Sequence, residues 1–252
     1  MNNVLEAQAI NRSFGGIHAV VDVDLCLVAG EIRAVIGPNG AGKTTLVGLL
    51  AGSLRPDSGG ICLAQQDVTA LPVHERAKLG LARTFQITSL FPALSVFENI
   101  AIAVQGYQGH SFRFWHPANR KSVLIDRVRE LAQDMGLGQH IDDRAEVLSH
   151  GKHRLLELAM ALAANPSVLL LDEPAAGLGI EETQNLISIL ERIKRDAAVL
   201  LIEHDMDVVF SVADEITVMV DGGIIATGRP DDIRNNCEAQ RAYLGEAGVQ
   251  DA

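Results

Sequence analysis

One segment, Gly37 to Thr45, constrains the fold of this chain more than any other. It reads Gly-Pro-Asn-Gly-Ala-Gly-Lys-Thr-Thr, follows a short apolar strand predicted over residues 31–36, and precedes apolar residues at helical spacing that continue to Gly52. A glycine-rich loop between a strand and a helix lets successive backbone N–H groups point at one anion. The segment therefore predicts a phosphate-binding loop in an α/β domain.

The loop also supplies a cation and a hydroxyl at its end. We expect the ammonium of Lys43 to reach the β- and γ-phosphates of a nucleotide, and Thr44 to place its hydroxyl on Mg²⁺. The helix that follows presents the positive end of its dipole to the same phosphates. The candidate nucleotide-binding residues of the loop are Gly37, Pro38, Asn39, Gly40, Ala41, Gly42, Lys43, Thr44 and Thr45. Such a loop indicates a nucleotide but leaves kinases, GTPases, motors and transport ATPases open.

Strands and helices alternate along the last third of the chain. Because a parallel connection needs a crossover, this alternation predicts a parallel sheet with helices on both faces. The predicted elements there are a helix over 152–164, a strand over 168–171, a helix over 181–195, a strand over 198–203, a helix over 205–213 and a strand over 215–220. Earlier in the chain we expect a half-exposed strand over 20–28, a surface loop over 106–117 and an amphipathic helix over 119–136 that ends at Gly136.

Net charge and cysteine content narrow the class of protein. The chain has 252 residues and a formal charge of −11, which argues against a surface that binds nucleic acid or an anionic bilayer. Its three cysteines form no CxxC pair and suit a reducing compartment. We find no secretory signal and no run approaching the roughly 18 apolar residues of a membrane span.

Two acids end the buried strand that begins at Val168. Neighbouring side chains on a strand point in different directions, so Asp172 and Glu173 are able to divide two roles between them. We expect Asp172 to hold Mg²⁺ through water and Glu173 to polarise the attacking water as general base. The alternative is a strand that simply ends in solvated charges.

Five motifs in a fixed order give the chain its resemblance to the ATP-binding-cassette (ABC) ATPases, which covers residues 5–245. Gly37 to Thr45 resembles the Walker A loop, and Val168 to Pro174 resembles Walker B. Leu148-Ser-His-Gly-Lys152 resembles the family signature. The other two motifs are Gln86 in Arg-Thr-Phe-Gln, which resembles the Q-loop glutamine, and His204 in Leu-Ile-Glu-His-Asp, which resembles the switch histidine.

This resemblance implies a RecA-like parallel-sheet core with an N-terminal antiparallel β subdomain, both formed by residues of about 1–88 and 164–252, and a helical subdomain over about 89–163 that carries the signature. It implies that Gln86 contacts Mg²⁺ or the attacking water, that His204 senses the γ-phosphate, and that Phe14 stacks on adenine, although a lone Phe is also a common core residue. It also implies ATP and Mg²⁺ as ligands.

In the family the signature closes a nucleotide held by a second cassette. Ser149 stands where it can cap the helix of residues 152–164, and with Gly151 it would face the γ-phosphate of that partner. The implied assembly is a head-to-tail dimer with two ATP molecules between the subunits. Three residues depart from the commonest pattern, His150 and Lys152 in the signature and Gly179 after Walker B, and they put communication across the dimer in doubt.

Finer features resemble the ATPases of branched-chain amino acid and amide uptake, among them Phe97-Glu-Asn, Phe114-Trp-His-Pro in an insert over 106–122, and Arg241-Ala-Tyr-Leu-Gly. The resemblance implies a membrane permease, a second ATPase subunit, an external binding protein acting indirectly, and a place at the cytoplasmic face of the inner membrane. Leu90, Phe91, Leu94 and Phe97 form either the exposed surface that receives the permease or part of the core.

Several alternatives remain open from the sequence. The transported solute is an apolar amino acid or a small amide such as urea, and an ATPase of the lipopolysaccharide-export type shares much of the pattern. A soluble ABC protein of translation or DNA repair usually joins two cassettes or carries a long coiled coil, and this chain shows neither. A kinase would leave Ser149, Gly151 and His204 without a role.

Overall fold

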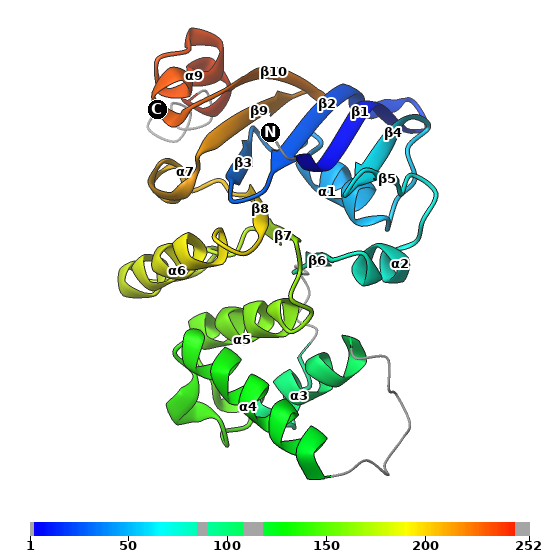
Figure 1. Cartoon of the computed structure of the whole chain (residues 1–252). Coiled ribbons are helices and arrows are strands. Elements are labelled where there is room, and N and C mark those ends of the chain that lie inside the picture. Colours follow the sequence, from blue (N-terminus) through cyan, green and yellow to red (C-terminus); the bar gives the residue numbers. More distant parts are fainter. Residues whose placement is uncertain (1–2, 85–89, 108–117, 245–252) are drawn as a thin grey trace.

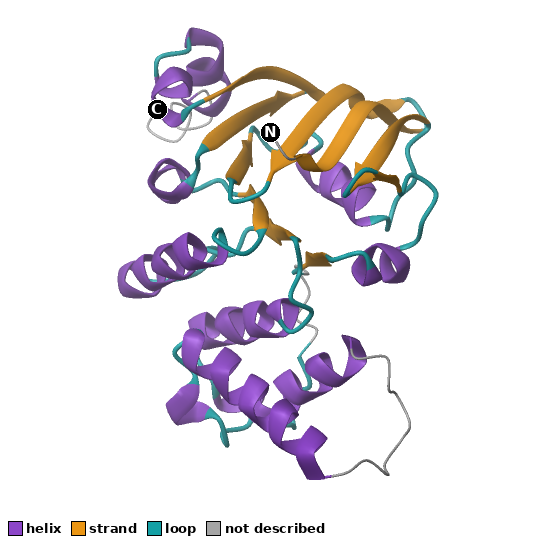
Figure 2. Cartoon of the chain, in the orientation of Figure 1, coloured by secondary structure: helices purple, strands orange, loops and turns teal. Residues whose placement is uncertain are grey.

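The computed structural model describes residues 3–84, 90–107 and 118–244, and its strands form two sheets. Figures 1 and 2 show the sheets in the upper half of the molecule and a group of helices below them. The larger sheet has the strand order β10-β9-β3-β8-β7-β6, with every neighbouring pair parallel except β10 and β9. Its strands are β3 (Ile32–Ile36), β6 (Leu81–Arg83), β7 (Val168–Asp172), β8 (Ala198–Ile202), β9 (Glu215–Val220) and β10 (Gly223–Gly228).

The smaller sheet is antiparallel and comes from the first quarter of the chain. Its order is β2-β1-β4-β5, and its strands are β1 (Asn3–Phe14), β2 (Ile17–Val28), β4 (Ser58–Leu63) and β5 (Gln66–Asp67). Helix α1 (Lys43–Ala51) lies beneath it (Figure 1) and shares one apolar core with both sheets. The phosphate loop therefore leads into a helix whose apolar side chains are packed between two sheets.

Alternation along the central strands assigns their side chains to two different cores. Within β7, Leu169 and Leu171 pack on one face of the sheet, while Val168 and Leu170 pack on the other. The first face is covered by α6 (Ile180–Ile193) and by the helical layer, and the second by α1. Further helices are α2 (Val73–Lys78), α7 (Met206–Val212), α8 (Pro230–Arg234) and α9 (Cys237–Leu244).

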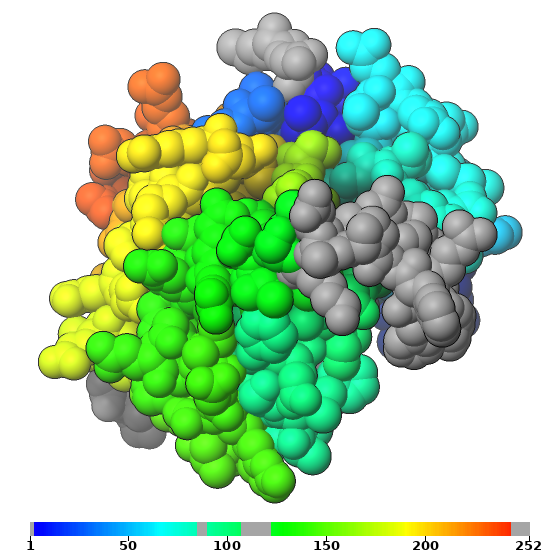
Figure 3. All heavy atoms as spheres, turned by 60° about the horizontal axis from the view of Figure 1, so that its bottom comes forward, coloured from blue at the N-terminus to red at the C-terminus, as the bar shows by residue number. Residues whose placement is uncertain are grey.

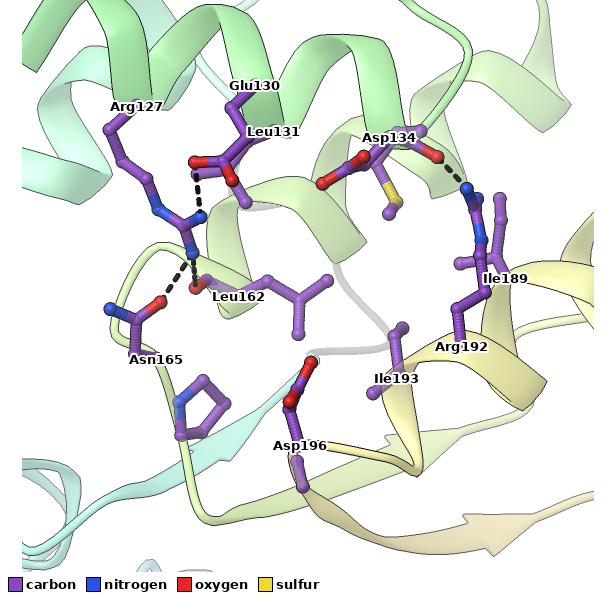
Figure 4. Close-up of a pocket in the computed structure, with 13 residues that line it drawn as sticks. Arg127, Glu130, Leu131, Asp134, Leu162, Asn165, Ile189, Arg192, Ile193 and Asp196 are labelled. Atoms are coloured by element: carbon purple, nitrogen blue, oxygen red, sulfur yellow. Dashed lines mark hydrogen bonds and ion pairs between the residues drawn. The ribbon is translucent and has the colours of Figure 1, made fainter.

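The helical layer consists of α3 (Val96–Tyr107), α4 (Ala118–Asp134) and α5 (His150–Leu162). Figure 3 turns this layer, in green, toward the viewer, beside α6 in yellow. A cavity of about 450 Å³ opens where α4 and the end of α5 meet α6 (Figure 4). Arg192 of α6 donates across it to the carbonyl oxygen of Asp134 at 2.7 Å, and Arg127 of α4 donates to that of Leu162 at 3.5 Å. Arginine side chains thus bridge the cavity from two helices.

The predicted elements of the last third are confirmed, with ends that differ by one or two residues. The strand expected over 20–28 is the second part of the longer β2. The amphipathic helix expected over 119–136 is α4, and Gly136 follows it in a left-handed conformation. The surface loop expected over 106–117 falls mostly outside the described residues. The three cysteines are free. Within the described ranges, no helix combines the length and apolar character needed to cross a membrane.

Candidate nucleotide-binding and hydrolysis site

Three neighbouring strands bring the predicted motifs to one edge of the larger sheet. Strand β8 lies between β3 and β7, and Ile202 is in register with Val35 on one side and with Asp172 on the other. The carboxyl ends of parallel strands meet at the same edge, where open α/β sheets bind their ligands. The phosphate loop, the acids at the end of β7 and the histidine after β8 therefore lie at one edge of the sheet.

The phosphate loop is shaped by glycines that no other residue could replace without strain. Gly37 has a φ of 150° and Gly42 a φ of 98°. A Cβ on Gly37 would lie 2.0 Å from the carbonyl oxygen of Met219, and one on Gly42 would lie 2.1 Å from that of Ala19. The loop is also fastened at Ala41, whose carbonyl oxygen accepts a hydrogen bond from the backbone of a neighbouring turn at 3.1 Å. Backbone packing thus fixes the cradle.

The cation of the loop lies inside this cradle. The Nζ of Lys43 donates to the carbonyl oxygens of Gly37 at 2.6 Å and Pro38 at 2.9 Å. Helix α1 starts at Lys43 with no side-chain cap and no acidic residue in its first turn. Its first N–H groups therefore keep their capacity for an anion. Thr44 is exposed beside them, and Thr45 is half-buried.

Asp172 has a buried carboxylate, and only one of its two oxygens has a hydrogen-bond partner among the described residues. Its Oδ2 pairs with Nη2 of Arg83 at 3.2 Å, while its Oδ1 is buried without a hydrogen-bond partner in the described structure. Burial raises the pKa of Asp172, and the charges of Arg83 and Lys43 oppose that rise. An orphaned carboxylate oxygen within electrostatic reach of the phosphate-loop lysine suits Mg²⁺, which binds one or two carboxylates together with phosphates and water.

Glu173 follows in a conformation that L-residues seldom adopt. Its φ is +50°, and its N–H donates to the carbonyl oxygen of Ile202 at 2.9 Å. Such a backbone costs about 1–2 kcal/mol and is found where the surrounding structure holds it for function. Its Oε1 lies 3.8 Å from Nδ1 of His204, whose side chain is 64% exposed. The candidate base and the candidate switch histidine are thus neighbours.

One acidic residue at this edge was missed from the sequence. Glu203 is buried, and its carboxylate accepts three backbone N–H bonds from two different loops. In the Leu-Ile-Glu-His-Asp run the sequence pattern points to His204 and assigns no role to Glu203. The available signal was an acidic residue directly after an apolar strand. Such a carboxylate can be buried only where nearby groups donate hydrogen bonds to it.

The signature region contacts the start of α6 within the same chain. Ser149 caps α5 as predicted, its Oγ accepting from the backbone N–H of Lys152 at 3.3 Å. The same hydroxyl lies 3.5 Å from Oε1 of Glu182, and a Cβ on Gly151 would lie 2.2 Å from that oxygen. The carboxylate of Glu182 therefore packs closely against the signature.

Two of the three departures from the common pattern, His150 and Gly179, lie beside this contact. His150 contacts the carbonyl oxygen of Ala176 through Nε2 at 3.3 Å, and the backbone N–H of Gly179 donates to Glu182 at 3.2 Å. The third departure, Lys152, makes a different contact, and its Nζ is 2.8 Å from Nε2 of His140. His150 therefore links the signature to the loop that follows β7, and Gly179 helps to hold the Glu182 carboxylate that packs against the signature.

Two remaining predictions concern Phe14 and Gln86. Phe14 is 42% exposed at the end of β1, with the Arg12 guanidinium 4.8 Å from its ring centroid, so it is not a core residue. Gln86 lies outside the described residues, and its role stays a prediction.

The apolar patch that begins at Leu90 was expected to be either an exposed surface or part of the core. Phe91 is exposed, as a surface for a permease requires. Leu90 and Phe97, in contrast, pack against the core. The patch is therefore partly exposed and partly core, and its contact with a permease stays a prediction.

Family models and known proteins match this arrangement. A family model described as "ABC transporter" matches residues 20–176. The chain belongs to this ABC family. A second model, described as a branched-chain amino acid ATP-binding cassette transporter, matches residues 224–249. The membership confirms the fold class, the nucleotide ligand and an ATP-hydrolysing subunit of a transporter.

Similar proteins extend over nearly the whole chain. The high-affinity branched-chain amino acid transport ATP-binding protein LivG of Escherichia coli K12 is 39% identical, covering 97% of this chain and 98% of that protein. BraF of Pseudomonas aeruginosa, with the same description, is 37% identical with the same coverage. The lipopolysaccharide export ATP-binding protein LptB of Haemophilus influenzae is 33% identical, with 97% and 98% covered.

Solved structures of ATP-binding cassettes share the fold of this chain. The ADP conformation of MJ1267, an ATP-binding cassette of an ABC transporter, is 26% identical and superposes with a TM-score of 0.85, covering 97% of this chain and 100% of that one. A nucleotide-free cassette from an ABC transporter, also 26% identical, gives a TM-score of 0.79 and covers 99% of this chain and 98% of its own.

Proposed function

We propose that this chain is the ATPase of an importer for branched-chain amino acids, acting at the cytoplasmic face of the inner membrane. The similarity to LivG and BraF at 39% and 37% identity over nearly the full length supports this solute class over an export system. A urea or amide importer and a lipopolysaccharide-export system are the alternatives. The proposed partners are a membrane permease, a second ATPase subunit and, indirectly, an external binding protein.

The observation that carries the proposal is the convergence of Lys43, Asp172 and Glu173 at one sheet edge. In this proposal the phosphate loop binds the phosphates and Phe14 stacks on adenine. Thr44, Asp172 and Gln86 would hold Mg²⁺, which neutralises charge on the β- and γ-phosphate oxygens when bound. Among the described side chains no cluster of three or more His, Cys, Asp or Glu could hold a metal ion, so Mg²⁺ here would take its other ligands from phosphates and water.

Glu173 accepts a proton from the attacking water, and His204 donates a hydrogen bond to the γ-phosphate. Ser149 and Gly151 would close the nucleotide of a second cassette in a head-to-tail dimer, so each chain supplies half of two sites. The proposed division is a core with the β subdomain over about 1–88 and 164–252, and a helical subdomain over about 89–163. Motion between these parts would transmit dimer closure to the permease.

The test of the hydrolysis site is Glu173→Gln, with Glu181→Gln as control because Glu181 is an exposed glutamate in the first turn of α6. We expect Glu173→Gln to bind ATP normally, to lose turnover by about 100-fold or more, and to form an ATP-dependent dimer. The control should hydrolyse ATP at the wild-type rate. Normal turnover by Glu173→Gln would remove the base assignment.

The solute is tested by gentle solubilisation of membranes followed by recovery of the chain with its permease and binding protein. Mass spectrometry of the solute bound to the recovered binding protein should find a branched-chain amino acid. Recovery of urea or another small amide would replace the solute class, and recovery with a lipid-exporting complex would replace the importer.

A further inference from the structure

Glu203 lies at the hydrolysis edge, and the proposed function gives it no role. Its side chain is fully buried behind His204, between the end of β8 and the start of α7. Its Oε1 accepts from the backbone N–H of Ala175 at 2.7 Å. Its Oε2 accepts from the backbone N–H groups of His204 at 3.1 Å and Asp205 at 3.4 Å. One carboxylate therefore joins two loops.

Each of the two loops carries a residue of the proposed chemistry. The loop after β7 carries Glu173, and the loop after β8 carries His204. A backbone hydrogen bond from the N–H of Glu173 to the carbonyl oxygen of Ile202 joins the two loops where they leave the sheet. The hydrogen bond from the N–H of Ala175 to Glu203 joins them a second time, two residues after Glu173. The 3.8 Å separation between Glu173 Oε1 and His204 Nδ1 thus lies within a frame held at two points.

A buried carboxylate is a costly way to hold two loops. An ionised carboxylate loses its hydration on burial and needs several hydrogen bonds to compensate. Burial raises the pKa of Glu203, and the bonds from Ala175, His204 and Asp205 lower it in part. The three hydrogen bonds that the structure gives its carboxylate all come from backbone N–H groups of the two loops. The backbone of the two loops therefore offsets the cost of removing the Glu203 carboxylate from water.

The same link reaches the signature region. Ala175 N–H binds Glu203, and the carbonyl oxygen of the next residue, Ala176, contacts His150. We propose that Glu203 is a positioning residue for ATP hydrolysis, which holds Glu173 and His204 at their working separation through the backbone of the two loops. The proposal rests on the roles assigned above to Glu173 and His204.

The experiment is Glu203→Gln in the full-length chain. Glutamine keeps the volume, but its NH₂ group faces a backbone donor on one loop where the carboxylate supplied an acceptor. Because small misplacement of reacting groups is costly, kcat should fall by about 10- to 100-fold. ATP affinity by calorimetry and the KM for ATP should change by less than about twofold, since the phosphate loop is untouched.

The matched control is Glu31→Gln. Glu31 is also mostly buried and also accepts a backbone N–H bond, from Val28 at 3.0 Å, but it precedes β3 at the opposite end of the strand from the phosphate loop. It should lose thermal stability without losing kcat. Equal kcat loss in the control, or a parallel fall of kcat and ATP affinity in Glu203→Gln, would overturn a positioning role.

Coupling to the histidine gives a second readout. In a His204→Ala background, Glu203→Gln should lower the residual turnover much less than it does in the wild type, and a fully additive loss would overturn the proposal. Should Glu203→Gln not fold, Glu203→Asp, which is too short to span both loops, is measured in the same way. Normal turnover of Glu173→Gln would remove the proposed function itself, whereas an inactive Glu173→Gln beside an unimpaired Glu203→Gln removes only this inference.

Discussion

The phosphate loop and the signature region both present backbone N–H groups at the start of a helix, but they are held by different means. At the start of α1, Gly37 and Gly42 are packed against backbone carbonyl groups, and no side chain caps the helix. At the start of α5, the contacts come from side chains, those of Ser149, His150 and Glu182. The first region is fixed by main-chain geometry and the second by groups that can rotate.

This difference follows from where each region lies. The phosphate loop is continuous with the central strand β3 and with α1, whose side chains are shared between two sheets. The signature lies on the helical layer, which meets α6 around an open cavity. A region proposed to meet a second subunit is expected to be less rigidly built than one that binds its ligand alone. Substitutions should therefore act strongly at the first region and weakly at the second.

The largest effect is expected for Gly42→Ala. Its methyl group would lie 2.1 Å from the carbonyl oxygen of Ala19, at a φ of 98° that alanine disfavours. We expect the free energy of unfolding to fall by about 3 kcal/mol or more, with loss of ATP binding. Gly40→Ala is the control, because its φ is 82° but nothing lies within 4 Å of the added methyl. Denaturant unfolding should show a loss of only about 1 kcal/mol there, and equal losses would contradict the packing argument.

The second prediction concerns the far end of α1. Arg76 is fully buried and donates to the carbonyl oxygens of Leu49 and Leu50, both at 2.7 Å, and to two further carbonyls. Burial lowers the pKa of Arg76 to about 10, so it stays charged at neutral pH. Arg76→Met would leave these carbonyls without their donor, and the free energy of unfolding should fall by about 2–4 kcal/mol. A melting temperature unchanged from the wild type would show that α1 does not depend on this contact.

The rigid region could be predicted from the sequence better than the adjustable one. Gly37, Lys43, Asp172 and Glu173 follow from local pattern, because a strand, a glycine loop and a helix place them without help from distant segments. The alternation of strands and helices predicted the parallel sheet for the same reason.

Contacts between distant segments could not be predicted in this way. The contact of Glu182 with Ser149 joins residues far apart in the chain, and no periodicity reports it. Arg76 and Glu203 were missed for a related reason, since their partners are backbone groups, and those of Leu49, Leu50 and Ala175 lie in other segments. Such partners carry no side-chain signal in the sequence.

The third prediction tests whether the buried carboxylate of Asp172 lowers the free energy of unfolding. Burial raises the pKa of Asp172 above its ordinary value of 3.8, so the folded state binds its proton more tightly than the unfolded state does. The resulting penalty is present above the folded pKa and disappears as the pH falls toward 3.8. Asp172→Asn should therefore raise the melting temperature of the nucleotide-free chain at neutral pH, by about 2–4 °C, while hydrolysis is lost.

Thermal unfolding followed from about pH 7.5 to about pH 4.5 checks both the sign and the pH dependence. The advantage of Asp172→Asn over the wild type should shrink as the pH falls. An advantage that grew toward acid pH, or a variant less stable than the wild type at neutral pH, would show that the ion pair with Arg83 outweighs the desolvation of Asp172.

The smallest effect is expected for His150→Gly, which restores the commonest residue of the family signature. The substitution removes one exposed contact, between Nε2 and the carbonyl oxygen of Ala176 at 3.3 Å, and leaves Ser149 as the cap of α5. Exposed contacts of this kind contribute within about 0.5 kcal/mol, so unfolding should be nearly unchanged and ATP turnover should change by less than about threefold. A loss of turnover comparable to that of Gly42→Ala would mean that the signature is as tightly determined as the phosphate loop, because a single rotatable side chain would then decide whether the site can close.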